Sequence, residues 1–183
     1  MNSTCKDRTT KSARRYVSPN TRPLTREEAE TRALAYAIKD PSCDRDLIDA
    51  AAREMAKQID GERGYLIPVP DHTGHTTANR KLAECIAFCT GNKFEVADDL
   101  FRTAPTESAC ERHKKRLTTI PVEFHHIEKK GTHTITLSPT GAERIYFVDN
   151  VITSGNTIEA CRQAFFGLGN GLVYADAHHD HRN

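Results

Sequence analysis

Short apolar segments alternate with helical patterns over the last two thirds of the chain, and this alternation constrains the fold most strongly. Four apolar segments have the length of buried strands: 65–70, 94–97, 144–148 and 172–175. Helical spacing begins near Thr76 or Thr77 and again near Thr157. Strands that are joined by helices pair in parallel, because the helix returns the chain to the starting end of the sheet. The sequence therefore predicts an α/β fold with a parallel sheet flanked by helices.

Two further helices are predicted before these strands. Thr25 followed by Glu28 is a capping-box pattern that begins the first helix. Ser42 or Asp44 can cap a second helix, whose apolar positions continue to Ile59. Two weaker strands are also expected, at 122–124 and 134–137.

The first 23 residues are expected to form a flexible basic arm, and residues 24–183 a single domain. Residues 1–26 carry seven basic side chains against Asp7 alone, and they show no apolar period. Such a segment buries too little apolar surface to offset the entropy of ordering. A nucleic-acid-binding arm and an organelle transit peptide are the alternatives, and the second is weakened by the missing apolar helical face.

The composition of the chain argues against several classes of protein. A net charge of +1 over 183 residues gives no global attraction to nucleic acid or membranes. No apolar run approaches the roughly 20 residues that span a bilayer, and no apolar core of a secretory signal is expected. The six cysteines include no C-x-x-C pair, which argues against a zinc ribbon and favours a reducing, cytoplasmic setting.

The segment RIYFVDNVITSGNTIEACRQA, residues 144–164, carries the clearest chemistry. Its apolar strand, Ile145–Val148, is followed by Asp149 and Asn150, which we expect at the carboxyl end of that strand. A turn rich in hydroxyls then leads into a helix, whose unpaired N–H groups attract anions. The residues of this turn are Thr153, Ser154, Gly155, Asn156 and Thr157. The segment predicts a sugar-phosphate site, and a strand–turn–helix without a ligand is the alternative.

Two common nucleotide-binding patterns do not account for this segment. The P-loop sequence G-x-x-x-x-G-K-[ST] does not occur in the chain. Gly167, Gly169 and Gly171 are spaced G-x-G-x-G and follow a helix, so they indicate a helix end and a turn rather than a dinucleotide site.

IYFVDNVITSGNT resembles the signature of the type I phosphoribosyltransferases, in which four apolar residues precede two acidic residues and a hydroxyl-rich phosphate loop. Upstream, LIPVPDHTGHTTANRKLAECIA is similar to the first strand, pyrophosphate loop and following helix of that family, and somewhat resembles its ComF-like branch. The resemblance follows the element order over residues 63–177 and is strong residue by residue at 145–157. It implies a phosphoribosyltransferase-like, Rossmann-like core.

The resemblance also implies a substrate, 5-phosphoribosyl 1-diphosphate (PRPP), bound with Mg²⁺ that is held through PRPP and water near Asp149. Asp149 and Asn150 would be the catalytic pair that faces the ribose hydroxyls, and residues 153–157 would hold the 5′-phosphate. The pyrophosphate loop would consist of Asp71, His72, Thr73 and Gly74. A nucleobase or a related nucleophile would be the acceptor, and pyrophosphate would be released.

A mobile basic loop that covers the diphosphate is expected within 102–118. Its candidate residues are Arg102, Arg112, Lys114, Lys115 and Arg116, each of which is otherwise a solvated charge. The acceptor base needs a hood, for which helices 25–60 and the tail 176–183 are both candidates. The histidines of that tail are expected to be exposed rather than to bind a metal. A homodimer is an expectation from the family.

Two departures from the family pattern bear on activity. Asn150 stands where the family usually has a second acid, and it can bind a hydroxyl but supplies no charge. Thr153 stands where several members have an acid–base aspartate. A PRPP-binding sensor or accessory protein with little or no transferase activity is therefore the alternative function, and a nucleic-acid-associated protein that uses the basic arm is a third.

Overall fold

The computed structural model describes residues 10–17, 22–108, 111–112, 115–131, 135 and 143–177. Lys114 and the tail histidines lie outside these residues, as does most of the strand that was expected at 134–137. Within the described part of the chain, no helix is long and apolar enough to cross a membrane.

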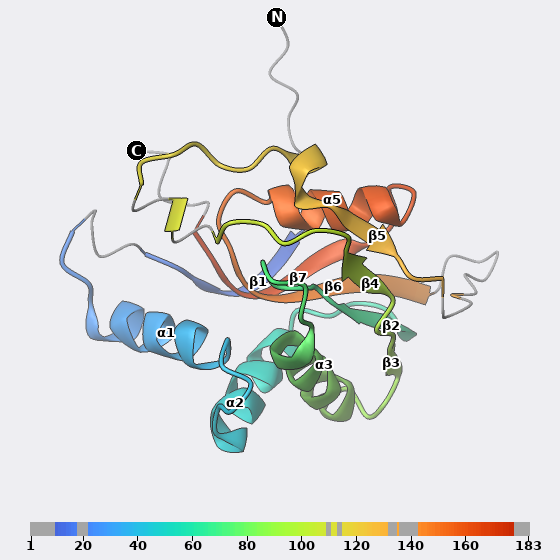
Figure 1. Ribbon diagram of the computed structural model, residues 1–183. Helices are drawn as coiled ribbons and strands as arrows, with labels where there is room; N and C mark the ends of the chain where they lie inside the picture. The colour runs from blue at the N-terminus through green and yellow to red at the C-terminus, as the bar shows by residue number, and fades with distance from the viewer. Residues whose placement is uncertain are drawn as a thin grey trace, which may run out of the picture.

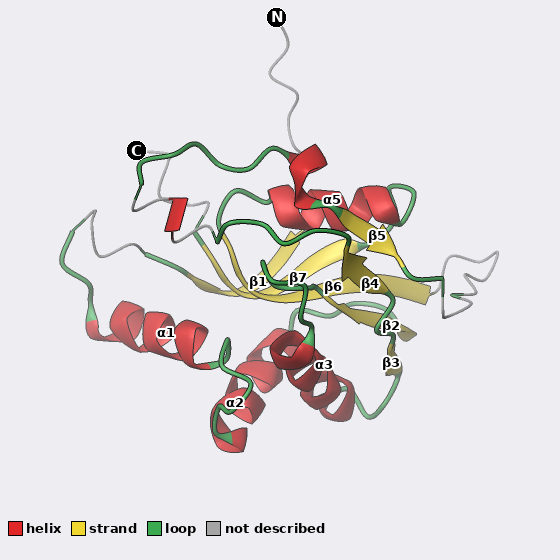
Figure 2. Cartoon of the chain, in the orientation of Figure 1, coloured by secondary structure: helices red, strands yellow, loops and turns green. Residues whose placement is uncertain are grey.

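A five-stranded parallel sheet forms the centre of the structure (Figures 1 and 2). Its order is β1 (Thr10–Arg15), β7 (Asn170–Asp176), β6 (Glu143–Ile152), β2 (Arg63–Pro68) and β3 (Phe94–Val96). Every neighbouring pair of strands runs in parallel. The predicted α/β fold with a parallel sheet is therefore confirmed, and this sheet is compatible with a Rossmann-like core.

Helices cover both faces of this sheet (Figure 1). On one face lie α1 (Arg26–Ala37), α2 (Arg45–Ala56) and α3 (Thr77–Cys89). On the other face lies α5 (Asn156–Ala164). The capping box is present, since Glu28 N donates to Thr25 Oγ1 and Thr25 N donates to Glu28 Oε2. Asp44 caps α2, which ends at Ala56 rather than continuing to Ile59.

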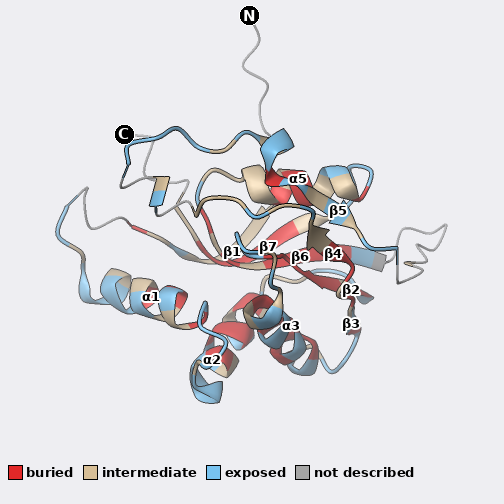
Figure 3. Ribbon diagram, viewed as in Figure 1, coloured by how far each residue is buried: buried red, intermediate tan, exposed pale blue. Residues whose placement is uncertain are grey.

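The buried hydrophobic residues form two clusters, one on each face of the sheet. Figure 3 colours the buried residues red along the strands and helices. Successive residues of a strand point to opposite faces, so β6 contributes to both clusters. Tyr146 and Val148 pack with α2 and α3, whereas Ile145 and Phe147 pack with α5. The continuous apolar run in β6 is thus explained by a strand that is buried on both faces.

Residues 10–15 differ from the flexible arm that the sequence predicted. They form β1, an edge strand paired with β7, and Tyr16 N continues the ladder by donating to Asp176 O over 2.8 Å. Arg14 donates to both carboxylate oxygens of Glu54 on α2, at 2.5 and 2.7 Å, and to Glu27 on α1. Acidic partners on two helices therefore hold the basic side chain of a strand that has no apolar period.

Two further elements correct the prediction. Residues Val122–His125 form a 3₁₀ helix, η1, so the strand expected at 122–124 was wrong. Beside α5, a separate antiparallel pair joins β4 (Leu100–Arg102) to β5 (Ile127–Lys129). These three-residue strands are too short to show a clear alternation of apolar and polar residues.

The close approach of β2 to β6 yields a prediction for Gly64. A Cβ at this position would lie 1.9 Å from the carbonyl oxygen of Arg144, which belongs to the backbone and cannot move aside. We expect Gly64→Ala to lower the free energy of unfolding by about 3 kcal/mol, as overpacking does. Gly91→Ala is the control, because its Cβ would meet nothing within 4 Å and only the positive φ of 68° opposes it, at a cost of about 1 kcal/mol. Equal losses in urea unfolding would contradict the close approach.

Candidate functional site

The candidate site lies where the carboxyl ends of β2 and β6 meet. The two strands are neighbours, with Pro68 opposite Val148, and Val69 N donates to Val148 O over 3.0 Å. From β2 the chain continues through α3 to β3 on one side, and from β6 through α5 to β7 on the other. Because α3 and α5 cover opposite faces, the two loops leave the sheet in opposite directions (Figure 1). In open α/β sheets the region between two such loops is called the crevice, and it is where ligands bind.

The loop after β2 is a compact turn organised by one carboxylate. Asp71 Oδ1 accepts hydrogen bonds from Thr73 N at 2.8 Å, from Thr73 Oγ1 at 2.7 Å and from His75 N at 3.0 Å. Gly74 adopts a φ of 98°, which glycine reaches without strain. Burial raises the pKa of Asp71, but the hydrogen bonds from Thr73 and His75 together outweigh it, so the pKa lies below its usual value. The expected pyrophosphate loop is thus a preformed turn.

The segment after Val148 differs from the expectation in one respect. β6 continues to Ile152, so Asp149 and Asn150 lie within the strand rather than beyond it. The turn then follows with Gly155 at a φ of 79°, and α5 begins at Asn156. The expected phosphate residues 153–157 therefore surround the N-terminus of α5, as predicted, where unpaired N–H groups favour an anion.

Side chains of this turn also contact η1 and Ile120, which precedes it. Asn156 Nδ2 donates to Ile120 O over 2.8 Å, and Thr157 Oγ1 lies 3.5 Å from His125 Nδ1. Burial and the charge of Arg102 lower the pKa of His125. The segment 120–125 therefore supports the N-terminus of α5, which the sequence analysis did not anticipate.

Asp149 lies between the two loops. Its Oδ1 accepts hydrogen bonds from the backbone N–H of Asn150 at 2.8 Å and from Asn79 Nδ2 at 3.2 Å. Burial raises the pKa of Asp149, while the Asn150 N–H, the charge of Lys39, the Asn79 amide and the charge of Arg102 oppose that shift. A partly buried carboxylate with cations nearby is suited to interact with a polar or cationic ligand group.

The side chain of Asn150 is hydrogen-bonded to the backbone of the next residue. Its Oδ1 accepts a hydrogen bond from Val151 N at 2.8 Å, and the residue is 7% exposed. In this arrangement Asn150 stabilises the strand locally, and its amide oxygen is already engaged. Of the expected catalytic pair, Asp149 can carry a negative charge, whereas the amide of Asn150 cannot.

Arg102 does not belong to a mobile loop, in contrast to the prediction. It ends β4, where its Nε donates to Asp71 O over 2.6 Å and its Nη1 donates to His125 O. Burial lowers the pKa of Arg102, and the carboxylates of Asp149 and Asp71 oppose the shift. One guanidinium thus joins the turn after β2 to η1, which in turn contacts the N-terminus of α5.

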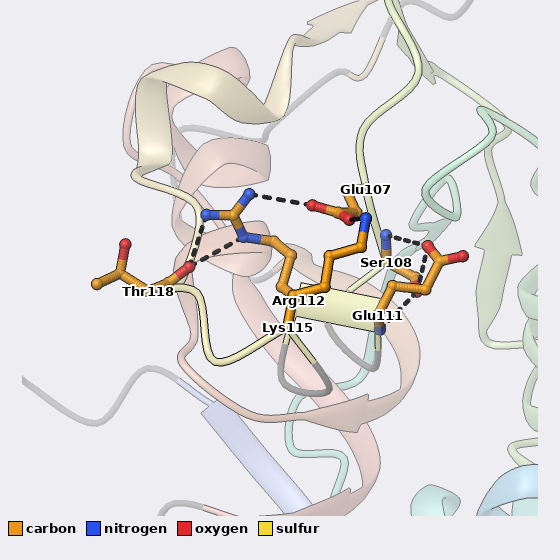
Figure 4. A network of polar contacts seen from close by, with 6 residues as sticks. All are labelled: Glu107, Ser108, Glu111, Arg112, Lys115 and Thr118. Atoms are coloured by element: carbon orange, nitrogen blue, oxygen red, sulfur yellow. Dashed lines mark hydrogen bonds and ion pairs between the residues drawn. The ribbon is translucent and has the colours of Figure 1, made fainter.

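The other described basic residues of 102–118 lie in a loop with its own polar network (Figure 4). Arg112 donates to Thr118 O over 2.7 and 2.9 Å and to Glu107 over 3.3 Å, and Lys115 also donates to Glu107. Arg116 is exposed and adopts a φ of 55°. Two of the expected diphosphate-binding cations are therefore engaged within the loop.

Three residues near the site were missed by the sequence analysis: Asn79, Lys39 and His125. Asn79 stands in the first turn of α3, within the segment that resembles the family, but no motif position distinguished it from its polar neighbours. Lys39 follows α1, beside a connection whose Pro41 carbonyl accepts a hydrogen bond from Lys81 of α3. His125 reaches the site only because η1 folds against α5.

A hollow of about 220 Å³ has a lining that differs from the residues of the candidate site. Its lining comes from η1, β5 and α5 and includes Glu123, His126 and Gln163. None of the expected phosphate-binding residues lines this hollow, so it does not define the candidate site.

Comparisons with known proteins add no assignment. No protein-family model, no curated protein and no solved structure matches this chain. The function therefore has to be argued from the geometry of the crevice and from its chemistry.

The turn after β2 yields a prediction about pH. The lowered pKa of Asp71 means that its ionised form stabilises the turn at pH values above its unfolded pKa, about 3.9. This stabilisation is lost as the pH falls through the lower, folded pKa. We expect the amide NMR signals of Thr73 and His75 to shift below about pH 4.

Asp71→Asn is the matched control, because its amide oxygen can still accept both backbone N–H bonds but does not titrate. The same signals should stay constant in that variant below pH 5. Shifts that persist there would assign the titration to another group and contradict the role of Asp71.

The bridge made by Arg102 yields a prediction about stability. Arg102→Lys cannot donate to two carbonyls in a fixed fork, so we expect the free energy of unfolding to fall by about 2 kcal/mol. Arg116→Lys, at an exposed position of the next segment, should change it by less than about 0.5 kcal/mol. If urea unfolding gives the same result for both variants, Arg102 does not join the two elements.

Proposed function

We propose that this protein binds PRPP between the loops that follow β2 and β6 and acts as a phosphoribosyltransferase-like enzyme. One observation carries the proposal: two turns, each suited to hold a phosphate, follow neighbouring parallel strands, and a carboxylate lies between them. The turn after β2 would hold the diphosphate, and the turn before α5 would hold the 5′-phosphate. A ribose that connects these two groups would then lie over Asp149.

The charges around the crevice suit the cleavage of PRPP. Breaking the bond between C1 and the diphosphate leaves positive charge on the ribose and negative charge on the leaving group. Asp149 would stabilise the first charge, because a fixed carboxylate in a partly buried site acts strongly. Arg102, whose guanidinium is fixed beside Asp71, would attract the second. A nucleobase or related nucleophile would then attack C1.

The residues of the crevice fit a magnesium ion that is held mainly by the substrate. Within the described residues, no group of three or more His, Cys, Asp or Glu side chains could hold a metal. Mg²⁺ keeps several waters and binds readily through one carboxylate together with substrate phosphates. Asp149 is the carboxylate placed for such contact through water, and the ion would supply positive charge for the departing diphosphate.

A PRPP-binding sensor with little or no transferase activity is the second candidate, and Asn150 favours it. The side chain of Asn150 brings no charge and already accepts a hydrogen bond from Val151 N. The developing positive charge would therefore meet one carboxylate instead of two. This arrangement would weaken catalysis more than the binding of PRPP.

The nucleic-acid hypothesis loses support from the described part of the basic arm. Lys11 pairs with Asp60 at 2.8 Å, and Arg14 pairs with Glu54 and Glu27. These cations lie on an edge strand of the sheet and are largely neutralised by neighbouring carboxylates.

Calorimetric titration with PRPP and Mg²⁺ tests the proposal. We expect micromolar binding, and a loss of at least tenfold in affinity in Asp149→Ala, because this change removes the carboxylate that would face the ribose. Asp46→Ala is the control, since Asp46 is exposed at the start of α2, and it should bind like the unchanged protein. The absence of binding by the unchanged protein would overturn the proposed function.

Release of pyrophosphate across a panel of nucleobases separates the two candidate functions. Turnover with one base supports the transferase, whereas binding without turnover supports the sensor. Asn150→Asp should raise turnover in the first case, with little change in PRPP affinity. Unchanged turnover would show that the second charge is not needed.

A further inference from the structure

Asn79 connects the elements that form the crevice. It lies in the first turn of α3 and is 7% exposed. Its Nδ2 donates to Val69 O, just after β2, over 2.8 Å, and to Asp149 Oδ1 on β6 over 3.2 Å. A single amide group therefore connects α3 with the end of β2 and with Asp149, the central carboxylate of the site.

The orientation of this amide is determined by its neighbours. Both partners are acceptors, a carbonyl oxygen and a carboxylate oxygen, so the NH₂ group has to face them. The carbonyl Oδ1 of Asn79 then points elsewhere, and within the described part of the chain it is buried without a hydrogen-bond partner. An unpaired buried acceptor costs free energy, which an apolar side chain of similar size would avoid. The two donated hydrogen bonds are thus the property that asparagine supplies here.

Few contacts hold Asp149 in place. Among the described residues, hydrogen bonds to its carboxylate come from Asn79 and from the backbone N–H of the adjacent Asn150. The charged or titratable groups that face it from other elements are Lys39 after α1, Arg102 on β4 and Cys161 on α5. Lys39 and Arg102 attract the carboxylate without fixing its rotation, whereas the directional hydrogen bonds to Oδ1 from the Asn150 N–H and from Asn79 Nδ2 restrict it. Of these two donors, Asn79 is the one that a side-chain substitution can remove.

We propose that Asn79 is a positioning residue, which orients the carboxylate of Asp149 toward the sugar of the bound ligand. The inference rests on the proposed function for the identity of that ligand. Asn79 itself need not touch PRPP. Its Nδ2 holds Asp149 Oδ1 on the side of α3, so that the other carboxylate oxygen, Oδ2, would be presented to the ribose.

Binding measurements on Asn79→Asp test this role. The substitution preserves the size of the side chain but removes both donors and places a second carboxylate beside Asp149. We expect the affinity for PRPP with Mg²⁺ to fall at least tenfold, whereas that for inorganic pyrophosphate with Mg²⁺ changes less than twofold. Pyrophosphate lacks the sugar, so it reports on the turn after β2 alone.

Asn79→Ala and Arg80→Ala complete the set. Asn79→Ala should show the same selective loss without the added charge. Arg80 is the next residue of α3, is exposed and forms ion pairs with Glu84 and Asp98, so its variant should bind both probes normally. Equal losses for PRPP and pyrophosphate would mean that Asn79 acts through the turn, and unchanged PRPP affinity would mean that it has no role. Either result overturns the inference.

A double-mutant cycle measured by unfolding tests the hydrogen bond between Asn79 and Asp149 without any ligand. Asn79→Ala, Asp149→Ala and the double variant are compared by urea unfolding. We expect the double variant to lose less stability than the two single variants together, because each single change already removes their shared hydrogen bond. Additive losses would overturn the positioning role. If the unchanged protein binds no PRPP while the cycle is non-additive, the proposed function fails and the orientation of Asp149 by Asn79 stands.

Discussion

The parallel pairing of β2 with β6 is the constraint on which the rest of the structure depends. Gly64 allows the two backbones to approach, and Pro68, where β2 ends, lies opposite Val148 of β6, just before Asp149. The chain leaves these two strands toward opposite faces of the sheet, through α3 and α5 (Figure 1). The position of the candidate site follows from this divergence, because open α/β sheets bind ligands where the loops of neighbouring strands part.

Two polar side chains, Asn79 and Arg102, connect different elements at this point of the sheet. Asn79 joins α3 and the end of β2 to Asp149, while Arg102 joins the turn at Asp71 to η1. Both side chains donate to acceptors on different elements, so each contributes more to the arrangement of the site than to the apolar core. Unpaired buried acceptors, such as Asn79 Oδ1, are the kind of cost that functional sites carry.

The sequence was informative where local patterns determine the structure. The capping box at Thr25 and the apolar run before Asp149 depend on neighbours within a few residues, and both were predicted. β1 was missed because its basic residues show no apolar period, and its pairing depends on β7 and on Glu54, 40 residues beyond Arg14. Likewise, Arg102 looked like part of a mobile basic loop, since its carbonyl partners lie 31 and 23 residues away. The phosphate-binding roles at 71–74 and 153–157 remain proposals that the fold makes geometrically consistent.

The most direct test of the central claim is an NMR map of the amide signals that PRPP and Mg²⁺ perturb. If the crevice is a PRPP site, the largest changes will fall in both turns, at 71–75 and 153–157, and at Asp149 between them. Changes confined to one turn, or to the hollow lined by Glu123 and Gln163, would show that the two turns do not hold one ligand and would contradict the account.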